Sequence, residues 1–151
     1  MATANIKITI PAFTTPFSAP GSGATVSMAN CIPTNMVMSS GPADRVSVTP
    51  PSGSGAGYVP GSITVTGKKA VRLAFSVVDA SGARYAECGL VFTTGTVNAG
   101  GTDNFPDFIV DDDGLLVTDS AGFSGSYSFL LLVQNSVFGM GLIDPKIINV
   151  S

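Results

Sequence analysis

Carboxylates gathered in one short segment are the residues of this chain best suited to chemistry. Six of the ten acidic residues fall between positions 103 and 119, and Asn104 adds an amide oxygen among them. These six are Asp103, Asp107, Asp111, Asp112, Asp113 and Asp119. Calcium takes six to eight such oxygens in flexible geometry, so the segment Asp103–Asp113 predicts a calcium-dependent, lectin-like binding module. The predicted metal ligands are Asp103, Asp107, Asp111 and Asp113.

The same segment has a second interpretation, in which the aspartates only shape a turn. The run Asp111-Asp-Asp-Gly114 is typical of a solvated hairpin tip, where Asp caps its own turn and Gly takes the left-handed conformation. The aspartate spacing also fails the EF-hand pattern. Nine Phe, three Tyr and no Trp leave few platforms on which a sugar could stack. Carbohydrate is therefore a secondary candidate as a partner.

Residues for most enzymatic mechanisms are missing. The chain has no histidine, which removes the usual general base, the Ser-His-Asp and Cys-His arrangements and the commonest zinc ligand. The run Gly53-Ser-Gly-Ala-Gly57 has no helix after it that could bind phosphate, so we interpret it as a loop. A carboxylate pair could serve a glycosidase only in a long cleft. We expect no enzymatic activity and no cofactor other than calcium.

Charge is sparse along the chain. Charged residues make up 11% of the sequence and the formal net charge is −3, which gives little electrostatic protection against self-association. The seven basic residues form only one loose group, Lys68, Lys69, Arg72 and Arg84, so no basic face is available for nucleic acid. We expect a structural or interaction protein that binds its own kind as a homo-oligomer, or another protein, and not nucleic acid.

β-strands must position these residues, because apolar and polar residues alternate with a period of two and helical periodicity is absent. The predicted strands are Ile6–Ile10, Arg45–Thr49, Ser62–Thr66, Lys69–Val78, Arg84–Thr93, Phe108–Val110, Leu115–Thr118, Ser126–Gln134, Met140–Ile143 and Lys146–Val150, with Ala24–Ala29 as a weaker candidate. Gly, Pro, Asn and Asp clusters separate them. The pattern favours a single all-β domain, residues 1–151, folded as an antiparallel β-sandwich of Ig-like or jelly-roll-like type with about eight to ten short strands.

Two hairpins anchor the predicted core. Asp79-Ala-Ser-Gly82 has the composition of a turn with Gly available for positive φ, and Asp111–Gly114 joins the second pair of strands. Large apolar residues alternate along the strongest strands, and we predict that they are buried against one another. They are Phe75, Val77, Leu90, Phe92, Phe129 and Leu131.

The two terminal strands are the predicted route to self-assembly. Ile6–Ile10 and Ile147–Val150 have few fixed neighbours, so we expect them at sheet edges, where unpaired N–H and C=O groups can pair with a second copy. Only Lys7 and Lys146 lie there to oppose such pairing. The alternative is a monomer whose two ends pair with each other inside one sheet.

Neither the cysteines nor the apolar stretches indicate a membrane protein or an exported disulfide scaffold. Two cysteines, Cys31 and Cys88, are too few for a disulfide framework, and we expect buried thiols while leaving their pairing open. The first ten residues lack the pattern of a signal peptide, and the longest apolar stretch, Phe129–Val133, is far too short to span a bilayer. We expect a cytoplasmic protein, with non-classical export left open.

From Phe75 onward the sequence resembles a group of small, uncharacterised bacterial β-domain proteins. The shared features are the hairpin Val77–Tyr85 with Gly89–Phe92, the Asn104-Phe-Pro106 loop, and the ending from Tyr127-Ser-Phe129 through Ile143-Asp-Pro-Lys-Ile147. The Asp-Pro-x-Ile close is also similar to the end of the larger bacterial inclusion-body family of AidA and PixA type, whose aromatic-rich ending is replaced here by Gly141-Leu-Ile143. The resemblance covers about half the chain and carries no site residues. It implies a cytoplasmic β-sandwich without known enzymatic activity.

Overall fold

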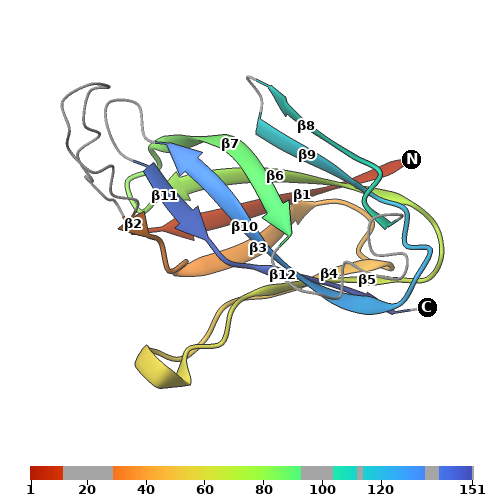
Figure 1. The fold of residues 1–151 in the computed structure, drawn as a ribbon, viewed down its shortest axis with the longest axis horizontal. Helices are drawn as coiled ribbons and strands as arrows, with labels where there is room; N and C mark the ends of the chain where they lie inside the picture. The colour runs from red at the N-terminus through yellow and green to blue at the C-terminus, as the bar shows by residue number, and fades with distance from the viewer. Residues whose placement is uncertain (12–28, 93–103, 112–113, 135–139, 151) are drawn as a thin grey trace.

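A computed structural model of the chain describes residues 1–11, 29–92, 104–111, 114–134 and 140–150, most of which lie in β-strands (Figure 1). The strands are β1 (Ala2–Ile10), β2 (Ala29–Asn30), β3 (Asn35–Ser40), β4 (Val46–Thr49), β5 (Ser62–Thr66), β6 (Val71–Asp79), β7 (Arg84–Phe92), β8 (Asp107–Asp111), β9 (Gly114–Asp119), β10 (Gly125–Gln134), β11 (Met140–Ile143) and β12 (Lys146–Val150). One 3-10 turn, η1 (Gly55–Gly57), lies between β4 and β5. The predicted all-β class is confirmed.

The predicted strands agree with the observed ones to within one or two residues at most ends, with larger differences at β1 and β3. β1 begins at Ala2 and not at Ile6, because Ala4 continues the buried phase of the isoleucines. The sequence pattern does not predict β3, in which Met36 is the one fully buried side chain and no alternation is visible. Most of the weaker candidate Ala24–Ala29 lies outside the described residues.

The strands form one connected sheet that mixes parallel and antiparallel pairs, so the predicted antiparallel sandwich is wrong. The main path runs β3-β1-β6-β7-β10-β12-β5-β4, and its two end strands approach each other, which makes the sheet nearly closed and barrel-like (Figure 1). The parallel pairs are β1 with β6, β12 with β5, and β11 with β2. Alternation could not distinguish these arrangements, because parallel and antiparallel strands share the same period of two.

Both terminal strands lie inside the sheet, which contradicts their predicted position at its edges. β1 pairs with β3 on one side and with β6 along its whole length on the other. β12 lies between β10 and β5. Ile6–Ile10 and Ile147–Val150 therefore offer no unpaired backbone for strand addition, and any edge contact must use another strand.

The core lies within the curved sheet and contains a central aromatic pair. Phe75 on β6 and Phe129 on β10 meet edge to face, with ring centroids 5.7 Å apart and an interplanar angle of 64°. Both rings are buried, as predicted. The other predicted core residues are Val77 and Leu131, which are fully buried, and Leu90 and Phe92, whose side chains lie outside the described part of the structure. Such aromatic pairs stabilise a fold by more than their buried area alone.

β6 divides the sheet, because its two halves pair with different neighbours. Its first half, Val71–Phe75, pairs with β9, whereas its end pairs with β7. At this fork the Val77 N–H donates to Glu87 Oε1 at 2.8 Å, so a side-chain carboxylate replaces a backbone carbonyl. A Cβ on Gly114 would lie 2.7 Å from the Phe75 carbonyl oxygen. Glycine is therefore needed at 114 for the β8–β9 hairpin to approach β6.

The turn after β6 has the predicted chemistry. Gly82 adopts a φ of +86°. Asp79 Oδ1 accepts hydrogen bonds from the Ser81 N–H at 2.9 Å, the Ser81 hydroxyl at 2.6 Å and the Ala83 N–H at 3.1 Å, while Oδ2 accepts one from the Tyr85 hydroxyl at 3.0 Å. These bonds, led by the Ser81 hydroxyl, lower the pKa of Asp79. The Asp79 carboxylate is thus occupied in holding the turn.

Candidate functional site

A narrow arm projects from the body between β4 and β5 (Figure 1). Its residues, 50–60, fold back as a two-stranded ribbon in which Ser52 and Val59 exchange backbone hydrogen bonds of 3.1 and 2.8 Å. At the tip, the η1 turn is closed by hydrogen bonds from the Gly57 N–H to the Ser54 carbonyl and from the Tyr58 N–H to the Gly55 carbonyl. The arm is therefore an ordered element.

The local sequence makes this arm stiff. Pro50, Pro51 and Pro60 restrict φ where the arm leaves and rejoins the body. Gly53 has a φ of +75°, and a Cβ there would clash with the Gly57 carbonyl oxygen, so only glycine fits. A segment that is already rigid loses little conformational entropy when it binds. The arm could therefore bind a partner at a small cost in conformational entropy.

The arm contributes nothing to the core of its own chain. None of residues 50–60 is buried, and the Val59 side chain is 58% exposed. An isolated two-stranded ribbon is at best marginally stable in water, and ordering one residue costs about 1–2 kcal/mol of backbone entropy. Pro51, Tyr58 and Pro60 are only partly buried and the other arm residues are exposed. Packing on a partner would account for an ordered ribbon with so little burial of its own.

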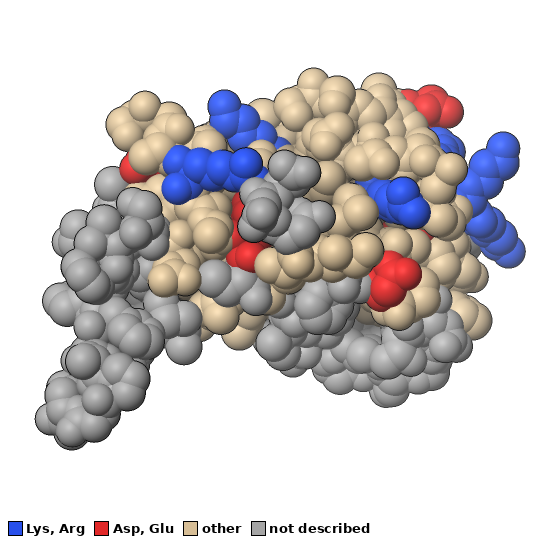
Figure 2. Space-filling model, turned by 90° about the horizontal axis from the view of Figure 1, so that it is seen from above, with Lys and Arg blue, Asp and Glu red and all other residues tan. Residues whose placement is uncertain are grey.

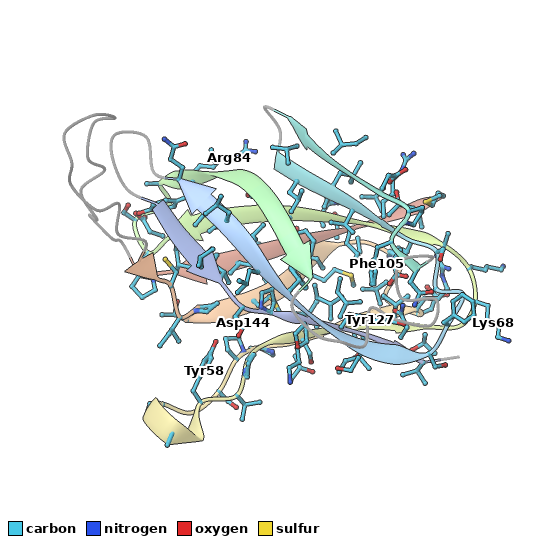
Figure 3. The ribbon with its side chains drawn as sticks, viewed as in Figure 1. Tyr58, Lys68, Arg84, Phe105, Tyr127 and Asp144 are labelled. Carbon is cyan, nitrogen blue, oxygen red and sulfur yellow. The ribbon has the colours of Figure 1, made fainter. Side chains whose placement is uncertain are left out.

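A cleft of about 440 Å³ lies at the base of the arm. Its lining comes from the body through Pro11, Ile32, Pro33 and Thr34, and from the arm through Pro51, Ser52, Gly53 and Tyr58. All eight residues are uncharged. Figure 3 shows Tyr58 on the body side of the arm, toward Asp144. Burial first, and then the negative charge of Asp144, raise the pKa of Tyr58, which keeps its phenol neutral. The cleft therefore suits an uncharged, largely apolar occupant.

The arm and the cleft belong to the least charged part of the chain. Between Ile8 and Gly67 the sequence has only two charged residues, Asp44 and Arg45, and the Arg45 guanidinium donates to the Lys69 carbonyl at 3.0 Å. By contrast, Figure 2 shows Lys, Arg, Asp and Glu side chains on the face seen from above, opposite to the arm. The arm and its flanking strands thus carry very little charge of their own, although Asp144 from another segment lies near Tyr58.

The predicted calcium ligands are only partly visible. Asp107 is exposed on β8, and Asp111 closes that strand, but its side chain lies outside the described residues, as do Asp103 and Asp113. In an extended strand, four residues span roughly 13 Å, so Asp107 and Asp111 of one chain stand at opposite ends of β8. Among the described residues, no group of three or more His, Cys, Asp or Glu could hold a metal. The calcium site stays a prediction.

Asp119 and Asn149 form a buried polar pair that the sequence pattern did not predict. Asp119 is fully buried at the end of β9, and its Oδ1 accepts hydrogen bonds from the Ala121 N–H at 2.8 Å and from Asn149 Nδ2 at 3.1 Å. Asp119 Oδ2 and Asn149 Oδ1 are buried and have no hydrogen-bond partner. The signal was present in the sequence, because Asp119 falls in phase with the inward-facing Leu115 and Val117.

Asn104, whose amide oxygen lies among the aspartates of the candidate calcium segment but which was not a predicted ligand, has a structural role. It is fully buried, and its Nδ2 donates to the Phe123 carbonyl and to the Tyr127 hydroxyl, each at 2.8 Å. Its Oδ1 accepts from the Phe123 N–H at 2.9 Å. Phe105 packs edge to face on Tyr127, with centroids 5.0 Å apart. Asn104 therefore holds the chain that enters β8 against the start of β10.

Comparison with known proteins identifies a fold relative. No family model matches the chain, and no curated protein matches it. Among solved structures, the inclusion body protein PixA of Burkholderia cenocepacia J2315 matches with a TM-score of 0.51 and 15% sequence identity, over 99% of this chain and 97% of that chain. The two proteins share a fold. This likeness agrees with the resemblance to the PixA type inferred from the sequence, and it extends over the whole chain.

Two further expectations concern the cysteines and the membrane. The Cys31 thiol is buried, as expected, and burial raises its pKa to about 11 against a backbone hydrogen bond with Leu142 that lowers it. It is therefore protonated at neutral pH. The side chain of Cys88 lies outside the described residues, so the pairing of the two cysteines stays open. None of the described residues forms a helix long and apolar enough to cross a membrane.

Proposed function

We propose that this chain is a non-enzymatic structural protein that acts in the cytoplasm by self-assembly, with the arm of one copy docked on the cleft of another. The observation that carries the proposal is the arm. Residues 50–60 are ordered and uncharged, yet none of them is buried within the chain. Contact with a second copy supplies the burial that the arm lacks.

The chain offers both sides of this contact. The cleft is lined by uncharged residues, and the arm is part of a segment, Val46–Gly67, without a single charge. Bringing two such surfaces together strips water from few ionic groups, with Asp144 beside Tyr58 as a charged neighbour, so little of the gain from apolar burial is lost. The base of the arm lines the cleft and its tip projects beyond it (Figure 1). If each arm enters the cleft of the next copy, the contact is heterologous and closes into a ring or continues as a filament.

Three of the described carboxylates have structural positions, which supports a structural role over a catalytic one. Asp79 holds a turn, Glu87 completes the fork in the sheet, and Asp119 is buried beside Asn149. A protein of like fold carries the name inclusion body protein, which agrees with assembly as the activity. These observations together favour a protein whose function lies in its contacts.

Light scattering over a wide concentration range tests the proposal. We expect wild-type protein to show a mean mass that rises with concentration above the 15.2 kDa of one chain. Val59→Lys places a charge on the arm and should lower that mass. Val150→Lys is the matched control, because Val150 is 47% exposed and lies at the end of β12, away from the arm. A wild-type species of constant 15.2 kDa would contradict self-assembly and leave binding of another protein as the function.

A further inference from the structure

The sheet exposes one apolar edge strand far from the arm. Among the described strands, β8 pairs only with β9, so its other side is open to a new strand. Ile109 is 52% and Val110 is 41% exposed, and adjacent residues of a strand face opposite sides, so both faces of β8 are apolar and accessible. Figure 1 shows β8 and the arm on opposite sides of the molecule. An edge of this kind is a template for strand addition.

The sequence of β8 is symmetric about its centre. It is Asp107-Phe-Ile-Val-Asp111, with Ile109 in the middle, an apolar residue on each side and an aspartate at each end. An isologous two-fold contact requires a surface that is complementary to itself. We propose that β8 is a second docking surface, which pairs antiparallel with β8 of another copy about a two-fold axis through Ile109.

This register determines which residues meet. Ile109 lies opposite Ile109 of the other copy, and Phe108 lies opposite Val110 twice, because the two strands run in opposite directions. Pairs of aromatic and β-branched residues directly opposite each other are among those that stabilise a sheet. The centre of the contact is therefore apolar throughout, and both new backbone edges are paired.

The same register places like charges at both ends of the contact. Asp107 of each copy lies opposite Asp111 of the other. Next to Asp107 on β9 lies Thr118, which is uncharged, and the basic residue in its register, Arg72 on β6, is two strands or roughly 10 Å away. At the other end the Arg84 guanidinium lies close to Gly114, since a Cβ there would be 3.5 Å from Arg84 Nη2. Asp107 is thus the end whose like charge weakens the pairing at low ionic strength, and the contact tightens when that charge is screened or removed.

A chain with both surfaces can build more than a dimer. The two-fold contact at β8 alone yields pairs, and the arm contact alone yields rings or filaments, whereas the two together link filaments sideways into an extended array. This last step rests on the proposed arm contact. The β8 contact does not, and its test is independent of the arm.

Cysteine cross-linking tests the two-fold axis directly. In Ile109→Cys, the added thiols of two copies lie directly opposite, and diamide oxidises them to one disulfide as both thiol hydrogens pass to the oxidant. Val110→Cys is the matched control, since its two copies lie on the diagonal at about 7–8 Å or more, beyond disulfide reach. We expect a covalent dimer from Ile109→Cys, and not from Val110→Cys or wild-type protein. Equal cross-linking of the two variants would overturn the proposal. So would the absence of cross-linking in both variants at about 1 M salt, where the repulsion between the aspartates is screened.

Asp107→Asn tests the charge effect in the same register. Because both copies carry the change, it removes two like-charge pairs, so the dimer of β8 contacts should form roughly 2- to 30-fold more tightly. The measurement is made in the Val59→Lys background, where arm contacts are absent. Unchanged or weaker association of Asp107→Asn would overturn the proposed register. If Val59→Lys leaves the assembly of wild-type protein unchanged while Ile109→Cys still cross-links, the arm proposal fails and the β8 proposal stands.

Discussion

Asp119 and Asn149 present two buried oxygens, Asp119 Oδ2 and Asn149 Oδ1, that accept no hydrogen bond. Their side chains already meet through the bond from Asn149 Nδ2 to Asp119 Oδ1. A proton on Asp119 Oδ2 would supply a donor, and Asn149 Oδ1 is the unsatisfied acceptor on the neighbouring side chain. Burial raises the pKa of Asp119 to about 6, against the opposing effects of the Ala121 N–H and the Asn149 amide. At the scale of single residues, this pair makes stability depend on pH.

Asp119→Asn should remove a pH-dependent loss of stability. The folded-state pKa of about 6 exceeds the ordinary 3.8, so the stabilising contribution is complete below about pH 4 and is lost as the pH rises through about 6. A shift of about two units corresponds to about 3 kcal/mol. The asparagine amide donates where the proton would, so the variant should match wild type at pH 4 and exceed it at pH 8 in urea unfolding. Asp144→Asn, on an exposed loop, is the control, and a loss of stability in Asp119→Asn at pH 8 would contradict the argument.

Phe129→Ala tests the core. The Phe129 ring is fully buried and packs edge to face on Phe75. Its removal leaves a cavity, and we expect a loss of about 3–5 kcal/mol in the free energy of unfolding. Phe123→Ala, at a ring that is 49% exposed, should cost much less. A circular dichroism melt of Phe129→Ala that matches wild type would show the core assignment to be wrong.

At the scale of the elements, the fork in β6 decides how the sheet curves. The backbone of β6 pairs with β9 over its first half and with β7 at its end, which leaves the Val77 N–H between the two partners. Glu87 satisfies this N–H, and burial raises the pKa of its carboxyl. The fork lets β7 turn toward β10 while β9 and β8 continue outward, so it also exposes the β8 edge.

Two substitutions of Glu87 separate its hydrogen bond from its charge. Glu87→Ala leaves the buried Val77 N–H without an acceptor and should destabilise the fold by about 1–3 kcal/mol in urea unfolding at neutral pH. Glu87→Gln keeps a side-chain oxygen that can accept the same hydrogen bond, so it should cost less than half as much. Equal losses in the two variants would mean that the hydrogen bond to Val77 does not support the fork.

Calcium binding by the segment Asp103–Asp113 is tested by titration. If Asp103, Asp107, Asp111 and Asp113 act as ligands, a hundredfold excess of calcium over its dissociation constant should stabilise the fold by about 2.7 kcal/mol and raise Tm. EDTA should reverse the rise. Asp113→Asn should abolish it, while Asp144→Asn should not. No heat in calorimetry and no shift in Tm would leave the hairpin-tip interpretation of the aspartates.

At the scale of the whole molecule, the chain separates two chemically different surfaces. The arm and cleft are uncharged, whereas β8 is apolar with aspartates at its ends. Because they lie on opposite sides of the molecule (Figure 1), one copy can engage a partner at each of them at the same time. The size and form of the assembly should then depend on whether one or both of these surfaces are intact.

Variants at the two surfaces should produce different assemblies. Val59→Lys should leave dimers joined through β8, Ile109→Lys should leave rings or filaments joined through the arm, and the double variant should be a monomer of 15.2 kDa. Electron microscopy and light scattering distinguish these states. Filaments that persist in the double variant would show that assembly uses another surface.

Sequence alone determined most of the strands and much of the core, because alternation is a local property of a strand that packs one face inward. β5, β11 and β12 have the predicted bounds, and Phe75, Val77, Phe129 and Leu131 are buried as predicted. The buried phase of β9 even reaches Asp119, which polarity alone would have placed outside. The neighbours of each strand could not be predicted in this way, because alternation carries no information about the direction of a strand or about which strand it pairs with.

Only the tertiary structure decided which backbone edges are open and where the uncharged segments lie. Strand pairing depends on long-range contacts, so the terminal strands, which sequence reasoning placed at the edges, take central positions, and β8 becomes an open edge. The glycine-rich run Gly53–Gly57 was predicted as a loop, yet its flanking prolines and one cross-ribbon bridge make it the tip of a projecting arm. Both surfaces that could join copies of this chain arise from packing between distant segments, which no local pattern encodes.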